Sequence, residues 1–181
     1  MSDHVFREYD IRGVAERDLS DDFAERLGRG LAEMLAPEGR APTLVVARDC
    51  RLSGERLENA LVRGLVAGGA QVVRVGVGPT PLMYFGVHHL NADGGIMVTG
   101  SHNPAEDNGF KIMKGKASFF GTQLVALRAR TKQPFGEVAG GSARDQDISD
   151  AYVEALTSRV ELGPHRFPFV IDAGNGGAGP L

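Results

Sequence analysis

The stretch Asp93-Gly-Gly-Ile-Met-Val-Thr-Gly-Ser-His-Asn-Pro104 places a short apolar run directly before a loop framed by glycine and proline. The run at residues 96–98 is typical of a buried strand, and the residues around it favour a turn. Gly100 has no side chain beside Ser101, so we expect a bulky anion to approach the backbone closely there. Ser101 is therefore a candidate nucleophile at the end of a buried strand.

A second chemically useful side chain, Lys111, follows Ser101 by ten positions. Asn108 and Gly109 form a turn signal ahead of it. In the alternation Phe110-Lys111-Ile112, successive strand residues point to opposite faces, so the lysine lies away from its two apolar neighbours. We expect an antiparallel pair of strands that brings the Ser101 hydroxyl and the Lys111 ammonium together.

Helical and strand patterns alternate along the rest of the chain. Ser20 is a helix N-cap candidate, because apolar residues at three- and four-residue spacing follow it from Phe23 to Leu31. A second helix is expected after Ser53. We also expect strands at residues 43–47 and 71–75, a short helix through Leu82 and Phe85, and a helix at residues 122–132. This order predicts a layered α/β domain with a mixed sheet between helices.

The last third of the chain predicts a change of domain. Residues 134–147 are rich in glycine, serine and charged side chains and are interpreted as a linker. The first domain then covers residues 1–147, and residues 148–181 are the beginning of a second α/β domain, with a helix at 148–161 and a strand at 167–171. Such a strand lacks partners to cover both its faces, so we expect a truncated piece of a longer protein.

Composition narrows the class of protein. The chain has 181 residues, of which 42% are hydrophobic and 24% charged, as in ordinary globular proteins. A net charge of −3 argues against nucleic acid and anionic membranes as partners. The single cysteine, Cys50, excludes an internal disulfide and suits a reducing compartment. The polar start and the lack of a long apolar run predict a cytoplasmic protein.

Three segments, taken in order, resemble those of the alpha-D-phosphohexomutase family, in its phosphomannomutase/phosphoglucomutase branch. They are Phe-Arg-Glu-Tyr-Asp-Ile-Arg-Gly at 6–13, Arg-Asp-Cys-Arg-Leu-Ser-Gly at 48–54, and Thr-Gly-Ser-His-Asn-Pro at 99–104 with Asp-Asn-Gly-Phe-Lys at 107–111. The resemblance covers the family's first domain and the opening of its second.

The resemblance implies a reaction. Phosphorylated Ser101 would donate its phosphate to a mannose or glucose monophosphate, and the hexose 1,6-bisphosphate would reorient and return its other phosphate to the serine. Isomerisation of hexose 1-phosphate and 6-phosphate results. Mg²⁺ is the implied metal, and the phosphate on Ser101 is the only ligand this chain would contribute. The remaining domains of the parent protein would supply the other metal ligands, and this chain alone is expected to be inactive.

The resemblance also assigns roles to individual residues. Lys111 is expected to transfer a proton or stabilise charge, and Arg12 to orient the phosphate, with Tyr9 binding substrate. His102 is also a catalytic-site candidate. Because adjacent residues of an extended chain point apart, we expect His102 to contact phosphate or order the loop rather than act as a base for Ser101. Cys50 stands where the family has glycine, and a positive φ there would strain the turn.

Other functions are also considered. Phosphoglucosamine mutase, of the same family, is the nearest alternative. A serine hydrolase would need a distant histidine brought to Ser101 by the fold, and the sequence around the serine does not read G-x-S-x-G. A binding module without chemistry would fit the chain taken alone. Residues 174–179 formally match the dinucleotide fingerprint G-x-G-x-x-G, but they resemble better the first turn of the second mutase domain.

Overall fold

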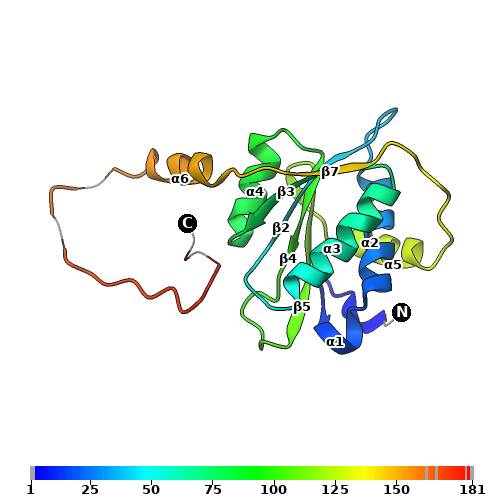
Figure 1. Ribbon diagram of the computed structural model, residues 1–181, viewed down its shortest axis with the longest axis horizontal. Coiled ribbons are helices and arrows are strands. Elements are labelled where there is room, and N and C mark those ends of the chain that lie inside the picture. The colour runs from blue at the N-terminus through cyan, green and yellow to red at the C-terminus, as the bar shows by residue number, and fades with distance from the viewer. Residues whose placement is uncertain (1–2, 162, 166, 178, 180–181) are drawn as a thin grey trace.

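The computed structural model describes residues 3–161, 163–165, 167–177 and 179. In this part of the chain the strands form one seven-stranded mixed sheet with helices on both faces (Figure 1). The strands are β1 (Ile11–Val14), β2 (Thr43–Arg48), β3 (Gln71–Val77), β4 (Gly94–Val98), β5 (Asp107–Lys114), β6 (Ala117–Ser118) and β7 (Ser142–Asp145). The expected layered α/β fold with a mixed sheet is confirmed.

The strand order is β1-β5-β4-β2-β3-β7, and β6 pairs with the end of β5. Strands β4, β2, β3 and β7 run parallel, whereas β5 is antiparallel to both β4 and β1. The expected antiparallel pair between the serine strand and the lysine strand is therefore present. The central position of β4 places the loop that follows it in the middle of one sheet edge.

The helices are the 3₁₀ turn η1 (Asp3–Val5), α1 (Ala15–Asp18), α2 (Asp21–Leu35), α3 (Gly54–Ala67), α4 (Thr80–His89), α5 (Thr122–Thr131) and α6 (Ser149–Thr157). Alternation along β2 divides the core between the two faces. Leu44 and Val46 join the cluster under α2, α3 and α5, whereas Val45 and Ala47 join the cluster under α4 and α6. None of the described helices is long and apolar enough to cross a membrane.

Local signals in the sequence explain where α2 begins. The Ser20 hydroxyl accepts a hydrogen bond from the Phe23 amide at 3.1 Å, which is the expected N-cap. Ser53 precedes α3 without such a bond, and its hydroxyl instead accepts a hydrogen bond from the Asn108 side chain. The helix start after Ser53 is correct, but its side chain ties α3 to β5 rather than capping the helix.

The interpretation of residues 134–147 as a linker is wrong in part. Residues Ser142–Asp145 form β7, whose register with β3 begins at Gln71 opposite Ser142. All four residues of β7 are exposed, so no apolar alternation marks the strand. Its pairing comes from the open backbone edge of β3, which a sequence pattern does not reveal.

The segment after β7 also departs from expectation. The helix α6 ends at Thr157, and Tyr152 packs against Phe85 of α4 with ring centroids 5.5 Å apart. No strand forms at residues 167–171, where Phe167 and Ile171 are each about four-fifths exposed. A strand needs backbone partners, and the described chain offers none at this segment. The position of a domain boundary at residue 147 stays a prediction.

Candidate active site

The serine loop begins where β4 ends, at the carboxyl edge of the parallel strands. Thr99 and Gly100 are buried, and Ser101 is exposed with a φ of 54°. A left-handed conformation costs a serine roughly 1 kcal/mol or more, so surrounding contacts have to hold it. One such contact is the hydrogen bond from the Ser101 amide to the Thr99 hydroxyl at 2.8 Å.

The left-handed conformation corrects the expectation for His102. The Ser101 Oγ lies 3.2 Å from His102 Nδ1, within hydrogen-bond distance. The expectation that the two side chains point apart assumed an extended chain, and the loop at Ser101 is not extended. His102 is exposed, and no contact to its other ring nitrogen is seen among the described residues.

Arg12 and Lys111 meet on a single carboxylate. Asp10 Oδ2 lies 2.6 Å from Arg12 Nη2 and 3.2 Å from Lys111 Nζ. Pairing of β1 with β5 explains the contact, since Arg12 stands opposite Gly109. Phe110, next to Lys111, is completely buried, as the alternation along β5 predicted.

Arg12 is also fixed against the serine loop. Its Nη1 donates to Asn103 Oδ1 at 2.7 Å and to the Gly100 carbonyl at 3.3 Å. Only 8% of Arg12 is exposed, so it is not an ordinary surface arginine. Asp10 and Asn103 are not among the residues predicted for the site. The spacing of Asp10 and Arg12, two positions apart in a strand-like stretch, is the signal for a shared face.

The five residues predicted for the site line one groove. Tyr9, Arg12, Ser101, His102 and Lys111 border a cavity of about 370 Å³. Arg7, Glu8, Asp10 and Asn103 complete its wall, so its cationic groups slightly outnumber its acidic ones. Guanidinium and ammonium groups beside a hydroxyl form a chemically suitable environment for a phosphate ester.

The space beside Gly100 is not open to a ligand. A side chain at this position would collide with the guanidinium of Arg51, which fills the space. The expectation that an anion approaches the backbone there is therefore wrong, because a long side chain from the turn after β2 reaches it first. The expected strain at Cys50 is also absent. Cys50 is exposed and its φ is not positive.

Ser101 also borders a second cavity, of about 770 Å³, on the other side of the loop. Arg51 and Asp49 line it together with Asn175, Gly176 and Gly177. The glycine turn near the end of the chain therefore lies against the first domain. The dinucleotide fingerprint that residues 174–179 formally match requires a helix directly after it. No described helix follows these residues, and residue 178 of the match lies outside the described residues.

The described residues do not fit a Mg²⁺ site on their own. No group of three or more His, Cys, Asp or Glu side chains with a suitable arrangement occurs among them. Two carboxylates that contact the loop are engaged, since Asp49 accepts from Thr99 and Asp107 accepts from Asn103. A ligand role for a phosphate on Ser101 stays a prediction.

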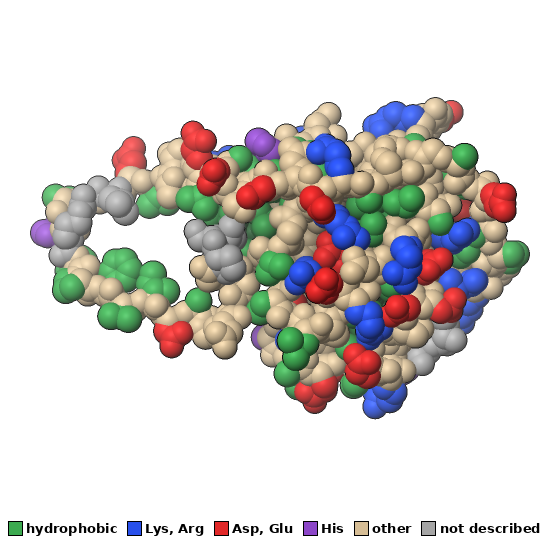
Figure 2. Space-filling model, in the orientation of Figure 1, with side chains coloured by type: hydrophobic (Ala, Val, Ile, Leu, Met, Phe, Trp, Pro, Cys, Tyr) green, Lys and Arg blue, Asp and Glu red, His purple; other side chains and the backbone are tan. Residues whose placement is uncertain are grey.

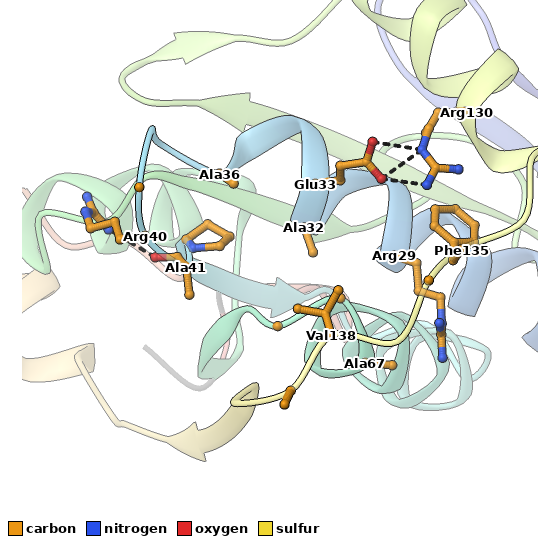
Figure 3. Close-up of a pocket in the computed structure, with 16 residues that line it drawn as sticks. Arg29, Ala32, Glu33, Ala36, Arg40, Ala41, Ala67, Arg130, Phe135 and Val138 are labelled. Carbon is orange, nitrogen blue, oxygen red and sulfur yellow. Dashed lines mark hydrogen bonds and ion pairs between the residues drawn. The ribbon is translucent and has the colours of Figure 1, made fainter.

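Figure 3 shows a separate cavity of about 510 Å³, lined by residues that come just before β2 and β3. It therefore lies at the amino ends of the parallel strands, whereas Ser101 follows the carboxyl end of β4. Alanines of α2 and α3 form its floor, and Phe135 and Val138 come from the segment that leads to β7. The guanidinium of Arg130 lies 4.1 Å from the Phe135 ring centroid and pairs with Glu33. None of the predicted site residues lines this cavity.

Fold and site together define the class of protein. It is a layered α/β domain that presents a serine beside an arginine and a lysine at the end of a central strand. The chain belongs to the phosphoglucomutase/phosphomannomutase family, because residues 3–132 match the family model described as phosphoglucomutase/phosphomannomutase, alpha/beta/alpha domain I.

Individual relatives agree with this assignment. The chain is 35% identical, over 98% of its length, to a phosphoglucomutase/phosphomannomutase of Thermococcus kodakarensis. It is 38% identical, over 99% of its length, to a phosphomannomutase/phosphoglucomutase of Pseudomonas putida. A crystal structure of a family protein from Burkholderia thailandensis superposes with a TM-score of 0.82 at 39% identity, over 90% of this chain and 37% of the other. The chain spans 41% and 38% of the lengths of the two curated relatives.

Proposed function

We propose that this chain carries the phosphoserine domain of a hexose-phosphate mutase that interconverts the 1- and 6-phosphates of glucose and mannose. The observation that carries the proposal is the shared groove, which Ser101, Arg12 and Lys111 line together. Family membership and the names of the relatives support the reaction class.

In the proposed reaction, the bond between phosphorus and Ser101 Oγ breaks while a bond from phosphorus to a sugar hydroxyl oxygen forms. As the bond forms, the hydroxyl proton passes to Lys111 in its neutral amine form. With Lys111 as an ammonium, the proton passes to water while Lys111 stabilises the charge on the transferring oxygens. Arg12 holds the phosphoryl group in line. The hexose 1,6-bisphosphate then turns round and returns its other phosphate to Ser101. No net hydrolysis occurs.

The proposal assigns Mg²⁺ and the rest of its ligands to the whole protein rather than to this chain. Hexose 1,6-bisphosphate is the intermediate and the activator. The partners are the hexose phosphate and the remaining part of the protein, with neither nucleic acid nor membrane among them. Acidic and basic side chains are interspersed over the face in Figure 2, which supports the exclusion of nucleic acid and membranes as partners. The single exposed cysteine, Cys50, supports a cytosolic setting.

Two alternative functions differ from the proposed one in ways that experiments can test. Phosphoglucosamine mutase shares the family and would differ in the sugar accepted. A serine hydrolase gains support from the 3.2 Å contact between Ser101 and His102. That contact is insufficient, because a histidine base needs a third group to orient it, and no such contact to His102 is seen among the described residues. Fluorophosphonate labelling of Ser101 would favour the hydrolase.

The test is phosphate mapping and turnover in the whole protein, with Ser101→Ala against Ser118→Ala as the matched control on the exposed strand β6. Peptide mapping should find about 80 Da of added mass, one phosphate, on the peptide that contains Ser101. Ser101→Ala should abolish isomerisation of glucose 1-phosphate, and Ser118→Ala should not. Phosphate on another serine, or near-normal turnover of Ser101→Ala, would reject the proposal.

A further inference from the structure

The serine loop is held from the side opposite Arg12 by one arginine that the reaction scheme does not use. Arg51 lies in the turn between β2 and α3, and its side chain is only 12% exposed. It does not line the groove that contains Lys111, so it acts on the loop and not on a ligand there. The hydrogen bonds that Arg51 makes to the loop indicate its role.

Arg51 donates to four backbone carbonyls of the loop. Its Nη2 lies 3.0 Å from the Ser101 oxygen and 2.6 Å from the Asn103 oxygen. Its Nη1 donates to the Asp107 oxygen at 2.8 Å and to the Pro104 oxygen. Only the planar fork of a guanidinium can present donors to four acceptors in fixed directions. The two ends and the middle of the loop are therefore tied to one rigid group.

Asp49 links this guanidinium to the part of the loop that precedes Ser101. Its Oδ1 accepts from the Arg51 amide at 3.0 Å, and its Oδ2 lies 3.4 Å from Arg51 Nε. The same Oδ2 accepts from the Thr99 hydroxyl at 2.7 Å and from the Gly100 amide at 3.2 Å. The Thr99 oxygen in turn accepts from the Ser101 amide. Asp49 thus fixes the backbone before the serine, while Arg51 fixes the backbone after it.

Gly100 shows that the loop and Arg51 are fitted to each other. Its φ is not positive, so glycine is not required there by backbone conformation. A side chain at this position would overlap the Arg51 guanidinium. The glycine therefore serves the close approach of Arg51, and its replacement should displace the same contacts without removing Arg51.

We propose that Arg51 is a positioning residue for phosphoryl transfer, which holds Ser101 in its left-handed conformation and so aims the Ser101 hydroxyl into the groove. This inference rests on the proposed function for its kinetic consequences. Its structural consequence, an ordered Ser101 loop, is independent of any reaction. The two consequences need separate experiments.

The kinetic experiment uses the whole protein with Arg51→Ala and Arg51→Lys. The control is Arg63→Ala, since Arg63 is an exposed arginine of α3 that pairs with acidic groups of α2 at 3.5 and 3.6 Å. We expect kcat of Arg51→Ala to fall about 100-fold with KM little changed, because the reacting oxygen is misplaced while the groove remains. Arg51→Lys should remain impaired, because one ammonium cannot serve four carbonyls.

Added guanidinium ion, below denaturing concentrations, provides the sharper readout. It should restore kcat of Arg51→Ala roughly tenfold by occupying the vacated position, and it should not raise kcat of Arg63→Ala. A merely structural loss elsewhere in the domain would not respond to guanidinium. Equal kcat values for Arg51→Ala and the unmodified protein would overturn the inference.

The activity-independent experiment measures amide hydrogen exchange by nuclear magnetic resonance in the present chain. The Ser101 and Gly100 amides should exchange faster in Arg51→Ala, whereas the Val46 amide in β2 should be unchanged. Gly100→Ala serves as the second variant where Arg51→Ala unfolds, and it should speed exchange at Ser101 and lower kcat. Unchanged exchange at Ser101 in a folded variant would overturn the inference. An unmodified whole protein without mutase turnover would refute the proposed function alone.

Discussion

The carboxylate of Asp10 lies 3.2 Å from the ammonium of Lys111, although 101 positions of sequence separate them. The antiparallel pairing of β1 with β5 makes this contact, and the same carboxylate oxygen binds Arg12 at 2.6 Å. One acidic group therefore contacts both cations of the groove that Ser101 also lines. Their positions are set in the chain without a ligand, which is the preorganisation that the proposed phosphoryl transfer requires.

Lys111→Met should lower turnover of the whole protein far more than it lowers the melting temperature of the chain. The Lys111 side chain is 28% exposed and contacts a carboxylate rather than the apolar core, so its loss removes charge and not packing. Lys114→Met is the matched control, since Lys114 is exposed at the end of the same strand. The measurements are the turnover rate of the whole protein and the melting temperature of the chain, each for both variants. Equal turnover of the Lys111 and Lys114 variants would make Lys111 an ordinary strand lysine.

His102→Gln should lower turnover only about fivefold, which corresponds to the loss of one hydrogen bond of about 1 kcal/mol. The reason is that His102 contacts Ser101 while no described residue orients its ring from the other side, so we expect it to order the loop rather than move a proton. His88→Gln, at an exposed position near the end of α4, is the control. A loss of about 100-fold together with a missing acidic limb in the pH profile would instead identify His102 as a general base.

The stability of the chain should depend on pH through Asp18. The pKa of Asp18 lies well below its usual range, mainly because the carboxylate accepts a hydrogen bond from Arg17. Burial opposes this effect, and a hydrogen bond from the Val14 amide adds to it. A folded-state pKa below the unfolded value means that the carboxylate stabilises the fold above the ordinary pKa of 3.8 and loses that contribution as pH falls further.

Asp18→Asn should therefore reduce the free energy of unfolding near neutral pH, and the gap to the unmodified chain should close as pH falls below 3.8. Urea unfolding at a series of pH values measures this gap. Asp22→Asn, at an exposed position in the first turn of α2, is the control. A gap that stays constant down to the acid limit would show that Asp18 acts through packing alone.

The present chain by itself should not isomerise hexose phosphates. Phosphoryl transfer depends on positioning both ends of the substrate, and the chain covers 41% and 38% of the two curated relatives. A coupled assay with glucose 1-phosphate, Mg²⁺ and glucose 1,6-bisphosphate measures the rate, with the whole protein as the positive control. Comparable turnover of the two proteins would contradict this prediction.

Much of the fold follows from patterns close together in the sequence. The apolar run before Ser101, the alternation around Lys111 and the cap at Ser20 each act over a few residues, so the elements they predict are present. The strand β7 was missed because its exposed residues Ser142–Asp145 owe their structure to the edge of β3. The strand expected at residues 167–171 is absent among the described residues because no neighbour pairs with it.

The sequence by itself determined which residues are predicted to form one site, and Tyr9, Arg12, Ser101, His102 and Lys111 all line the groove. Only the tertiary structure decided how they are held. Asp49 and Arg51 contact loop residues about fifty positions away, and the pairing of Asp10 with Lys111 likewise joins positions far apart in the chain. The physical reason is that periodicity and turn propensity act over a few neighbouring residues, whereas these contacts exist only once the sheet has brought its strands together.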